Sequence, residues 1–145
     1  MRWINAGRRP RPHEGGMGSV ASVHPPLIAI VEDDLAVLNS LDFALRAEGY
    51  EVCAATCVTD AKAHPAFPDA DCLVLDYGLP DGTGTVLLGD LRGRGLRCPA
   101  IVIASNPTRE CRRQAAAAGA PLVEKPLMGG ELIAQIAELI RATDG

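Results

Sequence analysis

The sequence predicts a doubly wound α/β fold, in which helices cover both faces of a five-stranded parallel sheet. Short apolar runs alternate along the chain with longer stretches whose apolar residues recur at helical spacing. The apolar runs are continuous instead of alternating with polar residues, as expected of strands that are covered on both faces. The chain has 145 residues, which is the size of one domain.

We expect the strands at 27–32, 50–55, 71–75, 99–104 and 120–124. Crossover connections between parallel strands are right-handed, and one common order for such a sheet is 2-1-3-4-5. This order makes the first and third strands neighbours. Its ligand crevice lies outside their carboxyl ends.

Three of the helices have clear signals. Leucines at helical spacing between 35 and 45 predict the first helix, and Gly49 follows it as a stop signal. The fourth helix is expected to take Asn106 as its N-cap and Pro107 as its first residue. An apolar stripe over 132–140 predicts the last helix.

The second and third helices have weaker signals. We expect the second helix to start at Thr59 or Asp60 and to end before Pro65. The third helix is expected near 83–92, with Thr83 at its start.

Composition and charge exclude several classes of protein. Apolar residues make up 48% of the chain, yet no apolar run has the roughly 18 to 20 residues of a membrane helix. The first residues lack the apolar core of a secretory signal, and the five scattered cysteines form no C-x-x-C pair. We therefore expect a cytoplasmic protein that contacts no membrane.

The chain divides into a short arm and one domain. Residues 1–26 are basic and rich in glycine, and we expect them to be a disordered arm, although a basic arm can also touch nucleic acid or an anionic lipid surface. Residues 27–142 hold the predicted domain, which is acidic. We expect no nucleic-acid binding by this domain.

Polar side chains gather at the carboxyl ends of the predicted strands. They are Glu32 and Asp33 after the first strand, Asp76 after the third, Ala104 and Ser105 at the end of the fourth, and Lys125 after the fifth. Carboxyl ends of parallel strands meet at one edge of a sheet, so we expect these residues to form one site.

Carboxylates that are forced together resist ionisation unless a cation compensates their charge. Oxygen ligands favour a hard ion, and Mg²⁺ needs few carboxylates because it retains waters. With Mg²⁺ bound, Asp76 could attack a phosphorus atom as a carboxylate nucleophile, and Lys125 would neutralise the incoming phosphoryl group.

The motifs "IVEDD", "LDYGLPDGTG" and "EKP" resemble those of receiver domains of two-component response regulators. The resemblance implies a flavodoxin-like fold, phosphorylation of Asp76 and a phosphate contact from Lys125. It also implies that Asp33 binds Mg²⁺ directly, that Glu32 acts through water, and that the Gly78 carbonyl completes the protein ligands. The "EKP" motif further implies a cis bond between Lys125 and Pro126.

The resemblance also bears on the role of the chain. Receivers of the nitrogen-fixation regulator class are the most similar. Only a short segment follows residue 142, and in this the chain resembles stand-alone receivers. A histidine kinase or phosphotransfer protein would be the phosphodonor, and an unknown downstream protein would bind the phosphorylated form. We expect a signalling protein and not an enzyme.

Two positions depart from the family pattern. Ala104 stands where receivers usually have a hydroxyl, and Leu122 stands where many have an aromatic residue. Alternation along the strand turns Ser105 away from the face of Ala104, so Ser105 is not expected to replace that hydroxyl. A degenerate receiver that binds partners without phosphorylation is therefore the alternative.

Two other classes of protein place an aspartate at a strand end. Aspartate-nucleophile phosphatases need a second acid two residues after the nucleophile, and cobalamin-binding domains of similar architecture need a histidine there. That position is Gly78. Both classes are disfavoured.

Overall fold

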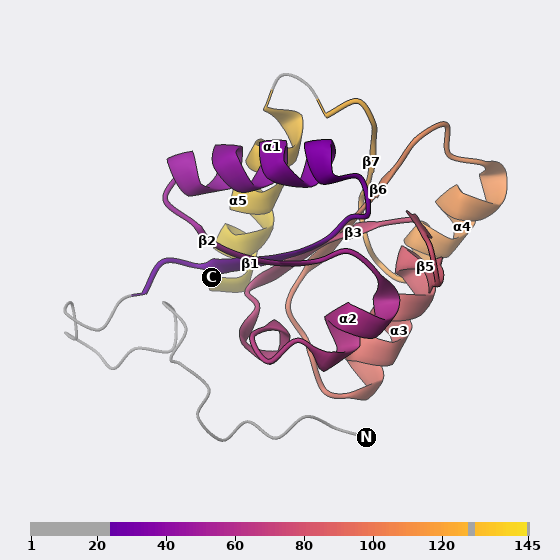
Figure 1. The fold of residues 1–145 in the computed structure, drawn as a ribbon, viewed down its shortest axis with the longest axis horizontal. Coiled ribbons are helices and arrows are strands. Elements are labelled where there is room, and N and C mark those ends of the chain that lie inside the picture. The colour runs from indigo at the N-terminus through magenta and orange to yellow at the C-terminus, as the bar shows by residue number, and fades with distance from the viewer. Residues whose placement is uncertain (1–23, 128–129, 145) are drawn as a thin grey trace.

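The computed structural model of the protein describes residues 24–127 and 130–144. A five-stranded parallel sheet lies at its centre, with strand order β2-β1-β3-β6-β7 (Figure 1). The strands are β1 (Leu27–Val31), β2 (Glu51–Ala55), β3 (Cys72–Asp76), β6 (Ala100–Ala104) and β7 (Leu122–Glu124). The predicted order 2-1-3-4-5 is confirmed, with β6 and β7 as the fourth and fifth strands.

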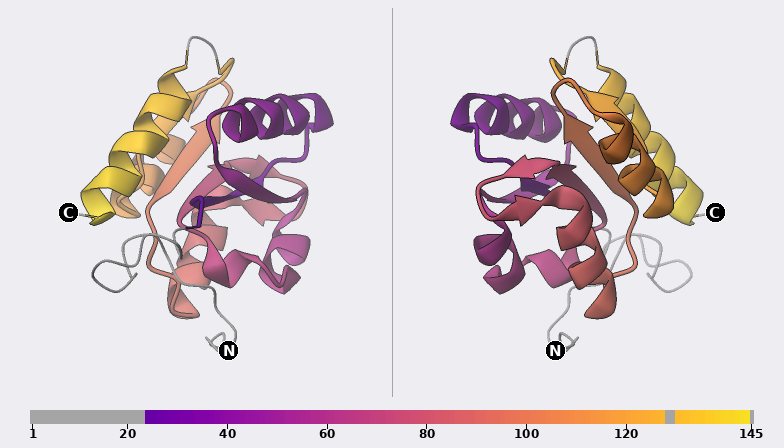
Figure 2. Two further views of the ribbon diagram at one scale, coloured as in Figure 1. Left: turned by 90° about the vertical axis from the view of Figure 1, so that its left-hand side faces the viewer. Right: turned by 90° about the vertical axis from the view of Figure 1, so that its right-hand side faces the viewer.

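Helices cover both faces of this sheet (Figure 2). On one face α1 (Leu35–Ala47) and α5 (Glu131–Asp144) pack over the strands. On the other face lie α2 (Val58–Ala63), α3 (Gly84–Gly93) and α4 (Arg109–Ala117). The doubly wound arrangement is therefore as predicted.

The sheet separates two apolar cores. One core holds Ile28 and Ile30 of β1 with Leu45 of α1 and Ile136 of α5, and all four side chains are fully buried. The opposite core joins the other face of the strands to α2, α3 and α4. Every residue of β1, β3 and β6 is buried, which explains why these strands are continuous apolar runs.

Two short elements were not predicted. A 3₁₀ helix, Phe67–Asp69, precedes β3 and buries the ring of Phe67 in the core. After β3 the chain forms a small antiparallel hairpin of β4 (Gly78–Leu79) and β5 (Gly82–Thr83). This hairpin places the loop after Asp76 beside the start of α3.

The helix starts were predicted with mixed success. Thr83 is the N-cap of α3, as expected, and its hydroxyl accepts a hydrogen bond from the Val86 N–H at 3.2 Å. The prediction for α4 was wrong, because Thr108 and not Asn106 is the N-cap. The backbone of Asn106 has φ 44°, so the chain makes a left-handed turn there before the helix can begin.

The predicted start of α2 was also wrong. The helix begins at Val58, and the Sγ atom of Cys57 accepts a hydrogen bond from the Asp60 N–H at 3.4 Å. A second cap comes from a distant residue. The Asp81 carboxylate, in the turn between β4 and β5, accepts hydrogen bonds from the N–H groups of Val58 (2.7 Å) and Thr59 (3.0 Å).

The arm predicted at 1–26 lies mostly outside the described residues, and the structure describes only its residues 24–26. In the part of the chain that the structure describes, no helix has the length and apolar character needed to cross a membrane.

Candidate functional site

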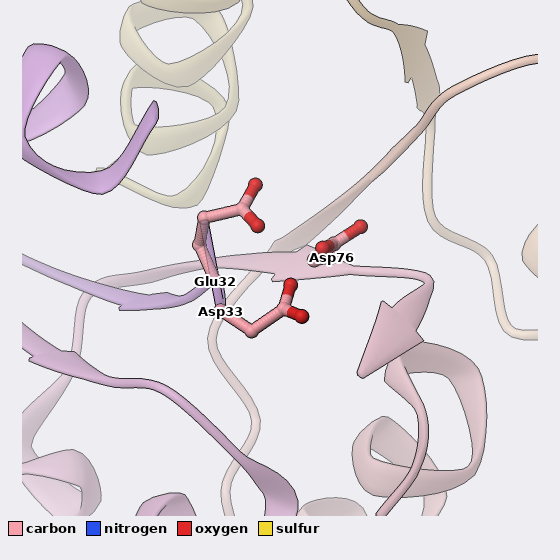
Figure 3. Close-up of side chains that lie close together, drawn as sticks. All are labelled: Glu32, Asp33 and Asp76. Carbon is pink, nitrogen blue, oxygen red and sulfur yellow. The ribbon is translucent and has the colours of Figure 1, made fainter. Parts of the chain in front are cut away.

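The predicted site residues come together at the carboxyl edge of the sheet. Val31 pairs with Leu75 across β1 and β3, so the residues that follow them, Glu32 and Asp76, lie on neighbouring strands. Asp76 in turn pairs with Ile103 of β6. Figure 3 shows the side chains of Glu32, Asp33 and Asp76 gathered at this edge.

Three carboxylates form the centre of the site. Ligand oxygens of Glu32, Asp33 and Asp76 lie within 4.8 Å of one another. Glu32 is completely buried, Asp76 is 5% exposed and Asp33 is open to solvent. The cluster is thus buried on the side of Glu32 and accessible on the side of Asp33.

Asp34, the third acid of the "EDD" run, has a different role. Its carboxylate caps α1 by accepting hydrogen bonds from the N–H groups of Ala36 and Val37. The Asp34 N–H donates a hydrogen bond to Oε2 of Glu32 at 3.1 Å. The start of α1 therefore helps to hold the buried Glu32 carboxylate in place.

Lys125 reaches the carboxylates from the strand at the far side of β6. Its backbone N–H donates to the Ala104 carbonyl at 2.8 Å, and its bond to Pro126 is cis, as the resemblance implied. The Nζ atom lies 2.7 Å from Oε1 of Glu32 and 3.3 Å from Oδ2 of Asp76. One ammonium group therefore contacts two of the three carboxylates.

The charged groups of the site shift one another's pKa values. Burial, together with the hydrogen bond and the negative charge of Glu32, raises the pKa of Asp76 to about 7, although Lys125 and the Gly78 N–H oppose this rise. Burial lowers the pKa of Lys125, but the hydrogen bonds and charges of Glu32 and Asp76 outweigh it, and the net pKa is raised. Lys125 is therefore a cation at neutral pH, and one cation faces three acids.

This donor set fits a hard divalent cation. The ligand atoms are all carboxylate oxygens, as Mg²⁺ prefers, and Asp33 opens the cluster to water that would complete the coordination shell. The raised pKa of Asp76 shows that its ionisation is unfavourable with Lys125 alone. A cation near Asp33 would offset this excess of negative charge.

Gly78 is the first residue of β4 and lies two residues after Asp76. Its backbone N–H donates to Oδ1 of Asp76 at 3.3 Å, so the glycine is already beside the site. A side chain added at Gly78 would meet nothing within 4 Å. The role of its carbonyl as a metal ligand stays a prediction.

The positions of Ala104 and Ser105 differ sharply. Ala104 is the last residue of β6, pairs with Glu124 and is buried, whereas Ser105 follows the strand and is exposed. Leu122 of β7 is partly buried against the core on the side of α2, α3 and α4. The end of β6 therefore carries a methyl group in place of a hydroxyl at its buried position.

Sequence reasoning missed the residues that support this edge. Gly84 packs directly on β3, because a Cβ atom added there would lie 2.4 Å from the Asp76 carbonyl oxygen. The side chains of Tyr77 and Thr85 contact Gln114 of α4. A glycine in a D-x-x-L-P-x-x-x-G pattern is a usable signal for the first contact, whereas local sequence gives none for the second.

The fold is shared with solved receiver structures. A CheY-like receiver domain protein from Methanospirillum hungatei JF-1 has a TM-score of 0.76 at 28% identity, covering 83% of this chain and 97% of the other. A putative response regulator from Chloroflexus aurantiacus J-10-fl has a TM-score of 0.73 at 27% identity, covering 81% and 98%.

The curated relatives are transcriptional regulatory proteins. The transcriptional regulatory protein KdpE of Mycobacterium tuberculosis is 34% identical over 116 residues, which cover 79% of this chain and 51% of the relative. The transcriptional regulatory protein PrrA of Mycobacterium leprae is 31% identical over 120 residues, covering 82% and 52%. The chain thus spans about half the length of these relatives.

The family model of the response regulator receiver domain matches residues 28–137, from the start of β1 into α5. The particular likeness to nitrogen-fixation regulators stays a prediction. With its acid pair, its strand-ending aspartate and its lysine at one edge of the sheet, the chain belongs to the response regulator receiver domain family.

Proposed function

We propose that this chain is a phosphoacceptor receiver, phosphorylated on Asp76 in the presence of Mg²⁺, and that it signals by protein contact. The observation that carries the proposal is the position of Asp76. Its carboxylate ends β3 within 4.8 Å of two other acids, and Lys125 Nζ lies 3.3 Å away. A nucleophile, a metal-binding acid pair and a fixed cation are thus combined in one place.

The chemistry is a transfer of a phosphoryl group. An oxygen of Asp76 would form a bond to phosphorus while the bond from phosphorus to the leaving group breaks. With a phosphohistidine donor the leaving group is an imidazole nitrogen, which takes up a proton from solvent. The product is an acyl phosphate on Asp76.

Each neighbouring residue has a defined part in this transfer. Lys125 would move its ammonium from the carboxylates toward the phosphoryl oxygens and neutralise their charge. Asp33, Asp76 and the Gly78 carbonyl would hold Mg²⁺, and Glu32 would act on it through water. When bound, Mg²⁺ supplies the positive charge that lets Asp76 ionise beside two other acids.

A mass measurement tests the proposal. Incubation with Mg²⁺ and acetyl phosphate should add the mass of one phosphoryl group, in an adduct that is stable to acid and labile to base. Asp76→Asn should abolish the adduct and keep the fold. Asp60→Asn changes an exposed acid of α2 and should keep both. An undiminished adduct in Asp76→Asn would exclude Asp76 as the acceptor.

The second candidate is a receiver that binds partners without phosphorylation. The buried Ala104 favours this reading, because it removes a hydroxyl from the end of β6. The mass measurement separates the two functions. A binding module would give no adduct, and Asp76→Asn would leave its partner binding unchanged.

The partners follow from the chemistry. We expect a histidine kinase or phosphotransfer protein as the phosphodonor, a downstream protein as the reader and the cytoplasm as the location. The proposed role is that of a phosphoacceptor and not of an enzyme. The relatives are named transcriptional regulators, but the chain spans only about half of their length, so DNA binding is not part of the proposal.

A further inference from the structure

Gln114 of α4 joins two hydroxyl groups that come from either side of the hairpin after Asp76. Its Oε1 atom accepts hydrogen bonds from Thr85 Oγ1 at 2.6 Å and from Tyr77 Oη at 3.3 Å. Tyr77 directly follows β3, and Thr85 lies in the first turn of α3. One amide on α4 is therefore bonded to both segments.

The orientation of this amide is fixed from its other end. Gln114 Nε2 donates a hydrogen bond to the Glu110 carboxylate at 2.9 Å, and Arg113 pairs with the same carboxylate. A carboxylate only accepts hydrogen bonds, so the amide nitrogen must face Glu110 and the amide oxygen must face the hydroxyls. The hydrogen bonds of Arg113 and Gln114 hold the pKa of Glu110 at about 2.

Tyr77 is attached to the backbone around the phosphoacceptor. Its N–H donates to the Ile103 carbonyl at 2.8 Å, and its carbonyl accepts from the Gly84 N–H at 3.1 Å. Tyr77 therefore spans β6 and the start of α3. Tyr77 is also the next residue after Asp76, so it is the first that a change in the position of Asp76 would reach.

Thr85 is attached to the same place by a second route. The residue before it, Gly84, lies against the Asp76 carbonyl so closely that no Cβ atom fits. The Thr85 side chain is itself buried and also lies 3.2 Å from the hydroxyl of the helix cap Thr83. Both hydroxyls that reach Gln114 are thus held at positions set by the Asp76 backbone.

The rest of α4 is only lightly attached to the domain. Its buried side chains are Cys111 and Ala115, which are small and bury little apolar area. The ion pair from Arg112 to Glu124 lies at the surface, where such pairs contribute about 0–1 kcal/mol. The hydrogen bonds of Gln114 are therefore a large part of what positions α4.

We propose that Gln114 couples the position of α4 to the state of Asp76 through the hydroxyls of Tyr77 and Thr85. The inference depends on the proposed function only where it concerns phosphorylated Asp76. Ala104 supplies no hydroxyl at the end of β6, so the coupling uses a different path, through the residues that follow Asp76. Tyr77, Thr85 and Gln114 are positioning residues in this path.

The test compares the amide spectrum of α4 in two pairs of states. The first pair is the protein with and without beryllium fluoride and Mg²⁺, which mimic the phosphoryl group. The second pair, free of ligand, is the protein with and without Asp76→Asn. With Tyr77 and Gln114 unchanged, both the addition of beryllium fluoride with Mg²⁺ and the substitution Asp76→Asn should shift the amide signals of Arg109–Ala117.

Two variants break the path at different points. Tyr77→Phe removes one hydroxyl and keeps the ring, and Gln114→Ala removes the amide while favouring helix. Both should retain the shifts around Asp76 and Lys125. Gln114→Ala should lose the shifts of α4, and Tyr77→Phe, which leaves the Thr85 hydroxyl bonded to Gln114, should reduce them. Arg112→Ala, the control on the same helix, should keep both sets of shifts.

Each outcome decides the matter. Shifts of α4 that persist undiminished in Gln114→Ala, or that are absent from the wild type in both pairs of states, would overturn the coupling. If beryllium fluoride gives no shifts at all, the proposed function fails. The coupling then still stands if the response of α4 to Asp76→Asn depends on Gln114.

Discussion

Lys125 is held closer to Glu32 than to Asp76. Its Nζ atom lies 2.7 Å from Oε1 of the fully buried Glu32 and 3.3 Å from Oδ2 of Asp76. The lysine side chain is itself only 15% exposed. A phosphoryl group on Asp76 must therefore attract an ammonium that already has a buried partner, and this competition sets several measurable properties of the site.

The first prediction concerns the free energy of unfolding. Glu32→Gln keeps the shape of the side chain and removes its charge. Breaking a buried ion pair costs about 3–5 kcal/mol, but Asp76 remains as a partner for Lys125 and is freed from the negative charge of Glu32, so we expect a loss below that range. Urea unfolding measures it. Glu124→Gln breaks the exposed pair with Arg112 and should cost less than about 1 kcal/mol. Equal losses would contradict the buried pair.

The second prediction is a pH dependence of stability. The folded protein raises the pKa of Asp76 from 3.8 to about 7, so the folded state holds this proton more tightly than the unfolded chain. The resulting stability is present below the unfolded pKa and is lost as pH rises through the folded pKa. Without metal, unfolding free energy should therefore fall between about pH 4 and pH 7.

Asp76→Asn is the control for that pH dependence, because it removes the titrating group and should remove this part of the fall. Mg²⁺ should also reduce the fall, since it favours the ionised carboxylate. The same slope in the wild type and in Asp76→Asn would show that Asp76 does not hold the proton.

The third prediction concerns metal binding, which should stabilise the folded state. The gain should be about 1.4 kcal/mol when free Mg²⁺ is about ten times its Kd. Asp33→Ala should lose the gain, because it removes the exposed acid of the cluster. Asp34→Asn should keep the gain in stability, because Asp34 is the N-cap of α1 and Asn is an equally good N-cap residue. If Asp33→Ala gains as much as the wild type, the metal is bound elsewhere.

The fold and the centre of the site could be predicted because they depend on regular geometry. Continuous apolar runs specify buried parallel strands, and parallel strands bring the residues at their carboxyl ends to one edge. Glu32, Asp76 and Lys125 therefore meet as expected, although they lie far apart in the sequence.

The errors arise where a distant residue or a competing neighbour decides the local structure. Asn106 and Thr108 are both good N-caps, and only the left-handed backbone of Asn106 makes Thr108 the one that caps α4. The start of α2 depends on Asp81, which is 23 residues away from Val58. The contact of Tyr77 with Gln114 crosses from β3 to α4, so no local pattern reveals it.

The fourth prediction uses two glycines of α3. Gly84→Ala places a methyl group 2.4 Å from the Asp76 carbonyl oxygen, so the helix must move from β3. We expect a loss of about 1–3 kcal/mol or more in unfolding free energy, together with weaker Mg²⁺ binding. Gly89→Ala meets nothing within 4 Å and should stabilise the helix by about 0.5–1 kcal/mol. Thermal unfolding compares the two, and a stable Gly84→Ala would refute the close contact.

The last prediction concerns the end of β6, where a buried alanine precedes an exposed serine. Ala104 is the last residue of β6 and continues the side of Val102, whereas Ser105 lies beyond the strand and is exposed. The Ala104 carbonyl is bonded to the Lys125 N–H, which keeps the strand regular to this point.

Because the resemblance to receivers assigns the responding hydroxyl to the position of Ala104, and Ser105 is exposed beyond the strand, we predict that Ser105 does not respond to a phosphoryl group. The loop at 105–108 should then move less than in typical receivers. Ser105→Ala should leave the amide shifts of this loop, caused by beryllium fluoride and Mg²⁺, unchanged. Ala104→Thr adds a hydroxyl at the buried position and should enlarge those shifts, at a cost of about 1–3 kcal/mol for the extra volume. If Ser105→Ala instead removes the loop response, the serine hydroxyl follows the phosphoryl group and the strand ends one residue earlier in that state.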